Sequence, residues 1–210
     1  MDQDGLDLLV GRLADRLLQI DRLLTADSGR RGSTLFALVR EIARGLEQQR
    51  DAIVASFGGA PAEERRVLGR KMLRLSQMSE ILGWFTPFVN DVERQEVPLG
   101  LLQIIDVLVD SLLPGGADPV IHFDARYMYS TLDVVKGVTP VLKALGVTPS
   151  PEVRPVVFFL PAGDPSNALL MPILAHEVGH AAVERGDLGG EVLRRVDATA
   201  LNTLFSACLV

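Results

Sequence analysis

The first half of the chain places apolar residues at the three- and four-residue steps of amphipathic helices. Leucine and isoleucine take these positions between residues 6 and 24, with arginine and aspartate between them. Ser33 can cap a second helix that reaches about Phe57. Residues 58–61, Gly-Gly-Ala-Pro, then break the chain before a third helix that ends near Leu82. The pattern therefore predicts a helical N-terminal region.

Short segments rich in β-formers follow this region. Residues 119–124 and 153–160 carry Val, Ile and Phe, and Pro and Gly bound them. They predict two strands, with a helix between them that covers much of residues 130–145. Another helix is expected from about Pro172 to Arg185, before a break at residues 186–190.

The run Pro-Gly-Gly-Ala-Asp at residues 114–118 marks a candidate boundary. We expect a helical N-terminal region over residues 1–115 and a second segment, with a short sheet, over residues 116–210. A last helix is expected to begin near Glu191. The predicted fold class is mainly α with a small α+β part.

One aromatic cluster, Trp-Phe-Thr-Pro-Phe at residues 84–88, stands out in a chain that is only 5% aromatic. Such a cluster can form a ligand cage or a hydrophobic corner between helices. We expect the corner, because burial of large apolar side chains is the commoner use of aromatic residues.

Composition and charge narrow the function classes. The chain has 21 basic and 27 acidic residues, a net charge of −6, which is the wrong sign for tracking a phosphate backbone, so we expect no nucleic-acid partner. Cys208 has no second cysteine to pair with, and the start of the chain is acidic, so we expect a cytoplasmic protein. The most apolar stretches, residues 99–113 and 168–183, contain charged or histidine residues and are short for a membrane span. With 48% hydrophobic residues, apolar helices can support self-association or a protein partner.

The sharpest chemical signal is His-Glu-x-x-His at residues 176–180, which contains two of the three histidines. Four residues turn a helix by about 400°, so His176 and His180 project from one face and can share a cation. Glu177 lies about 100° away, where it can accept a proton from water instead of binding the metal. Two core histidines beside an ion-paired glutamate are the purely structural alternative. The neighbouring positions are apolar, so the helix is expected to be buried.

The segment from Pro172 to Val183 resembles the active-site helix of zincin metallopeptidases. The resemblance covers about a dozen residues and implies Zn²⁺ held by His176 and His180, with Glu177 activating water for attack on a peptide carbonyl. It also implies a third protein ligand downstream, and substrate bound along an edge strand, for which residues 156–160 are placed. Val183 and Gly186 stand where metzincins have Gly and His, so a carboxylate ligand of the gluzincin or aspzincin kind is expected.

Among the acidic residues after the motif, the candidates for this ligand are Asp187, Glu191 and Asp197. If the last helix folds back antiparallel, Asp197 reaches the height of the histidine pair, whereas Glu191 stays near the turn. Asp197 also shares its helical stripe with leucines and alanines, where a carboxylate needs a partner. Asp197 is therefore the preferred third ligand, with Glu191 and a ligand outside this chain as alternatives, and Asp187 fits a solvated turn.

Three further residues are weaker candidates. His122, on the first predicted strand, could serve as a ligand or a transition-state donor, and packing is its more ordinary role. Tyr127 or Tyr129 could donate a hydrogen bond to an oxyanion, as tyrosines do in many zincins, but their spacing equally fits half-buried tyrosines.

Three functions stay open on these residues. The first is a zinc metallopeptidase whose N-terminal helices present, select or regulate a protein or peptide substrate. The second is a helical interaction protein with an inactive or structural zincin remnant, and the third is a hydrolase of a non-peptide amide. The apolar end at residues 207–210 follows His180 by only 30 residues. We therefore expect a shortened protein or an N-terminal fragment, active only with self-association, a partner or a longer form.

Overall fold

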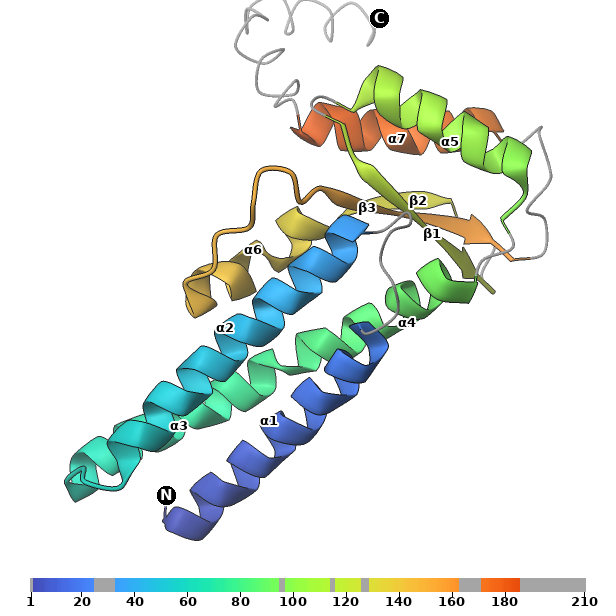
Figure 1. Cartoon of the computed structure of the whole chain (residues 1–210). Helices are drawn as coiled ribbons and strands as arrows, with labels where there is room; N and C mark the ends of the chain where they lie inside the picture. Colours follow the sequence, from blue (N-terminus) through green and yellow to red (C-terminus); the bar gives the residue numbers. More distant parts are fainter. Residues whose placement is uncertain are drawn as a thin grey trace, which may run out of the picture.

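The computed structural model of the chain describes residues 2–24, 33–94, 97–113, 116–125, 129–162 and 171–185. These residues are mostly helical and include one three-stranded sheet, which confirms the predicted fold class (Figure 1). The helices are α1 (Gln3–Leu24), α2 (Ser33–Phe57), α3 (Ala62–Met78), α4 (Glu80–Arg94), α5 (Leu99–Leu112), α6 (Val134–Leu145) and α7 (Met171–Arg185). The strands are β1 (Asp118–Asp124), β2 (Ser130–Asp133) and β3 (Pro155–Pro161).

The sheet has the order β1-β3-β2, with β3 in the centre. β1 runs parallel to β3 and β2 runs antiparallel to it. Ile121 and Thr131 are both in register with Phe158, one from each side. Since side chains in register point to the same face, these three residues share one face of the sheet.

Helices cover both faces of this sheet. Along β3, Val156, Phe158 and Leu160 belong to one apolar core together with residues of α5 and α7. The residue between the first two, Val157, belongs to a second core with α1 to α4 and α6. Figure 1 shows the resulting layers, with α5 and α7 on one side of the sheet and the remaining helices on the other. A strand buried on both faces explains the unbroken run of apolar residues in β3.

The start of α2 is held by a side chain from β1. The Asp118 carboxylate accepts hydrogen bonds from the backbone N–H of Thr34, at 2.8 Å, and from its hydroxyl, at 2.9 Å. The first N–H groups of a helix have no partner within the helix, so this carboxylate supplies one. The contact joins residues 84 positions apart and ties the helical layer to the sheet.

The observed elements add to one prediction and correct another. The helix expected over much of residues 130–145 is α6, and residues 130–133 before it form β2, a strand that was not predicted; Asp133 caps α6 by accepting a hydrogen bond from the Lys136 N–H. The predicted third helix is two helices. Ser79 separates them, and its hydroxyl donates to the Ser76 carbonyl at 2.6 Å.

The aromatic cluster of residues 84–88 lies inside α4, and two of its rings belong to the core that α4 shares with α1, α2, α3 and α6, which agrees with the expected packing between helices. Phe85 and Phe88 are buried, while Trp84 is half exposed and contacts both rings edge to face. Pro87 lies within the helix. The burial of the two phenylalanines favours helix here and outweighs the local preference of Pro for a turn.

The predicted boundary at residues 114–118 stays a prediction. One apolar core includes buried residues from α1 to α4 and also from β1, α6 and β3, so residues before and after this point pack together. Among the helices of the described ranges, none combines the length and the apolar character that a membrane span requires.

We expect Asp118→Ala to lower the free energy of unfolding by about 1 to 2 kcal/mol, because the variant leaves the Thr34 N–H at the start of α2 without its acceptor. Urea denaturation followed by circular dichroism measures this. Asp110→Ala, at an exposed site on α5, is the control and should change stability by less than about 0.5 kcal/mol. Equal stability of the two variants would contradict the cap.

Candidate functional site

The helix that carries the His-Glu-x-x-His motif, α7, lies against the sheet and α5. Leu174 and Val178 are fully buried, and Ala181 and Ala182 extend the same apolar stripe. These residues pack with Ile121 and Phe158 in one core. The stripe fixes which side of α7 faces the sheet, and hence where the polar residues of the motif lie.

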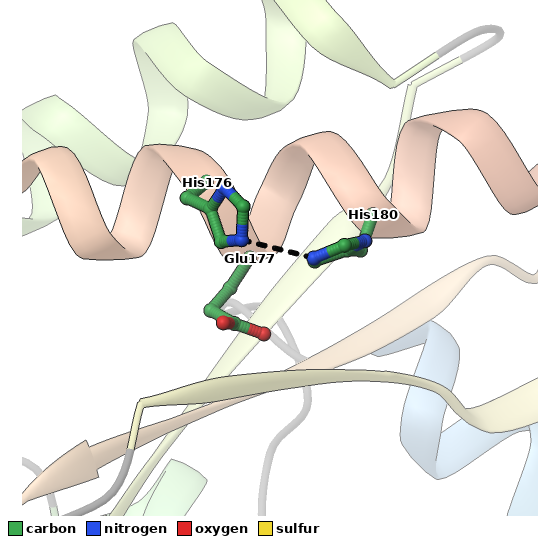
Figure 2. Close-up of side chains that lie close together, drawn as sticks. All are labelled: His176, Glu177 and His180. Carbon is green, nitrogen blue, oxygen red and sulfur yellow. Dashed lines mark hydrogen bonds between the residues drawn. The ribbon is translucent and has the colours of Figure 1, made fainter. Parts of the chain in front are cut away.

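His176 and His180 form a close pair one helical turn apart. Their Nε2 atoms are 3.0 Å apart, and the ring centroids are 4.5 Å apart with the rings nearly perpendicular (Figure 2). Both side chains are exposed, as are Ile173 and Val183 of the same helix, each 44% exposed. The prediction that this helix is buried therefore holds for the face toward the sheet and α5, and is wrong for the face that carries the histidine pair.

Glu177 lies beside the histidine pair and is half-buried. Figure 2 shows its side chain leaving α7 toward the strands, below the two rings. One ligand atom from each of the three residues can be chosen so that all three lie within 4.8 Å of one another. The arrangement agrees with the offset of about 100° per residue on a helix.

The donor set fits a divalent transition metal. Zinc binds imidazole nitrogen at about 2.0 to 2.1 Å, so two nitrogens 3.0 Å apart can reach one ion together. Imidazole nitrogen is also a preferred ligand for Zn²⁺, and a carboxylate within reach supplies either a further ligand or a base. The group of His176, Glu177 and His180 is thus one that could bind a metal ion.

The other residues proposed from the sequence divide into two sets. Asp187, Glu191, Asp197 and Tyr127 lie outside the described residues. His122 packs edge to face on Phe88 and Phe159, with centroids 5.2 and 5.4 Å away. These rings belong to the core on the far side of the sheet from α7, so His122 is a packing residue and does not join the histidine pair.

Tyr129 lies just before β2 on the side of the sheet that faces α7, partly buried against the core formed by α5, α7 and the sheet. The partial burial of Tyr129 agrees with the half-buried position that the sequence allowed for it. Its suggested role as an oxyanion donor stays a prediction.

The segment expected to act as an edge strand, residues 156–160, is in the centre of the sheet. β1 and β2 occupy both of its sides, so β3 has no free edge and that expectation is wrong. In the described part of the chain, β2 is the edge strand that packs against α7. The edge beside α7, which the sequence pattern assigned to residues 156–160, is therefore formed by residues 130–133.

One residue near the motif, on β2, could not be identified as part of the site from the sequence. Thr131 on β2 donates a hydrogen bond from Oγ1 to the backbone carbonyl of Glu177, at 3.0 Å. The two residues are 46 positions apart, and threonine is common in strands for its β-branched shape alone. Only the pairing of β2 with β3 brings this hydroxyl under α7.

No family model, curated protein or solved structure matches this chain.

In the metal-free protein we expect His176→Ala to change the free energy of unfolding by less than about 0.5 kcal/mol, because the ring is exposed. Leu174→Ala, on the buried stripe of the same helix, should lower it by about 2 to 5 kcal/mol. Urea denaturation in the presence of EDTA compares the two. A large loss for His176→Ala would assign this ring to the core.

Proposed function

We propose that the chain is a zinc-dependent metallopeptidase of the zincin kind. The observation that supports this most directly is the 3.0 Å separation of the His176 and His180 Nε2 atoms, with the Glu177 carboxylate beside them. The resemblance of residues 172–183 to the active-site helix of zincins supports the same function. Exposure of both rings leaves the pair accessible to a metal ion and to substrate.

In this proposal His176 and His180 hold Zn²⁺. When bound, zinc supplies a Lewis acid that polarises the substrate carbonyl and lowers the pKa of water. Glu177 takes a proton from a water molecule while the oxygen atom of that water forms a bond to the carbonyl carbon of the substrate. The C–N bond then breaks, and Glu177 returns the proton to the departing amine nitrogen. A half-buried carboxylate suits both steps, because it is held in place but stays within reach of water.

A peptide is the substrate class that best fits the surroundings of the motif. The outer edge of β2 carries backbone N–H and C=O groups that β3 does not use, since β3 pairs on the other side. An extended peptide can add to such an edge through main-chain hydrogen bonds. β2 also packs against α7, so a peptide on this edge would run beside Glu177.

The alternative is a helical interaction protein in which the motif binds metal structurally or not at all. The exposed apolar side chains of α5 favour it, with Leu99 71% and Val107 64% exposed. Glu177 favours the enzyme, because a structural metal site has no need of a base. The two functions differ in whether replacing Glu177 abolishes a measurable hydrolysis.

We expect Glu177→Gln to retain zinc and to lose hydrolysis by about 100-fold or more, because the amide cannot accept the proton. His176→Ala and His180→Ala should each lose zinc, since each removes one of two neighbouring ligands. Zinc content by atomic emission and cleavage of an unstructured protein measure these effects.

Loss of zinc in Glu177→Gln with hydrolysis retained would contradict the role of Glu177 as base. If the wild-type protein contains no zinc after purification with added zinc, the hypothesis of a zinc-dependent enzyme is excluded. Wild-type protein with stoichiometric zinc and no hydrolysis would favour the interaction protein.

The third ligand stays a prediction from the sequence. Replacing Asp197 by Ala should weaken zinc binding at least about 10-fold. This is the low end of the loss that follows when a residue that hydrogen-bonds to a metal ligand is replaced. Glu191→Ala is the matched control and should leave the affinity within about threefold. Competition with a chromogenic chelator gives both values, and equal affinities for the two variants would exclude Asp197.

A further inference from the structure

Thr131 joins two parts of the site that the sequence keeps 46 residues apart. Its backbone belongs to β2, the edge strand beside α7, and is in register with Phe158 of β3. Its hydroxyl donates to the Glu177 carbonyl at 3.0 Å in a part-buried setting. A single residue thus contacts both the candidate peptide-binding edge and the backbone of the candidate base.

Apolar contacts also hold α7 on the sheet. Leu174 and Val178 are buried in one core with strand residues, and such contacts fix which side of α7 faces the sheet but not its exact rotation and height. A hydrogen bond, in contrast, depends on distance and angle. The Glu177 carbonyl has two lone pairs, so it can accept from Thr131 and also take part in the helix.

We propose that Thr131 is a positioning residue, which sets the rotation and height of α7 over β2 and so places the Glu177 carboxylate beside a peptide bound on that edge. This inference rests on the proposed function. A base must lie within hydrogen-bond reach of the proton it takes, and a misplacement of about 1 Å can cost about 100-fold in rate.

The histidine pair should depend on Thr131 much less. His176 and His180 lie on the same helix, so the helix backbone sets their separation whether or not α7 moves over the sheet. Loss of the Thr131 hydroxyl should therefore separate two properties, with turnover falling while the affinity for zinc and the KM for peptide stay close to wild type.

The test uses Thr131→Val, which keeps the β-branched shape and removes the hydroxyl, and Thr131→Ser, which keeps the hydroxyl. We expect the Val variant to lose about 10- to 100-fold in kcat, with the zinc Kd and the KM within about threefold of wild type. The Ser variant should recover most of the loss. The matched control is Thr139→Val, which removes a part-buried hydroxyl that bonds within α6 at 2.9 Å and should leave kcat unchanged.

A second measurement needs neither zinc nor substrate. Amide hydrogen exchange of the zinc-free protein should speed up along α7 in Thr131→Val and stay unchanged along α2. Thr131→Ala repeats the measurement should the Val variant unfold. If the wild type is active and Thr131→Val changes neither kcat nor hydrogen exchange along α7, the positioning role of Thr131 is overturned and the proposed function stands.

A wild type that neither binds zinc nor cleaves peptide would overturn the proposed function and, with it, the catalytic reason for positioning. Hydrogen exchange would then still decide whether Thr131 holds α7 on the sheet. Equal losses of kcat in the Val and Ser variants would assign Thr131 to packing and overturn the inference.

Discussion

The burial of β3 on both faces is the constraint on which the rest of the structure depends. Alternate side chains of this strand enter two different cores, one with α5 and α7 and the other with α1 to α4 and α6. Each face needs a helical layer, because uncovered Val157 or Phe158 would lose the free energy of apolar burial. The strand thereby places α5 and α7 on one side and α1 to α4 and α6 on the other (Figure 1).

This layering determines what the motif can do. α7 turns its apolar stripe toward the sheet, so His176 and His180 are left on an exposed side, and Glu177 lies between the stripe and the rings. In the proposed function, a metal-binding pair at an exposed side would be open to ions and to substrate. A base at the border of the core would be held more firmly, which suits a group that must transfer a proton at a fixed place.

The same layering gives the short strand β2 a larger role than its four residues suggest. Among the described strands it is the edge of the sheet beside α7, and Thr131 ties it to the backbone of Glu177. The side of β2 that would receive a peptide and the helix that would supply the base are therefore connected by one hydrogen bond. Apolar packing is non-directional and defines that relation less exactly than a hydrogen bond does.

The sequence by itself determined the local features of this protein. Helical periodicity predicted α1 and α2 closely, and the four-residue spacing of His176 and His180 predicted their shared face, because helix geometry fixes both without reference to the rest of the chain. Only the tertiary structure decided which strand is the edge, which side of α7 is exposed, and that Thr131 meets Glu177. Those features depend on strand order and on pairing between distant residues, and local patterns contain no information on which segments become neighbours.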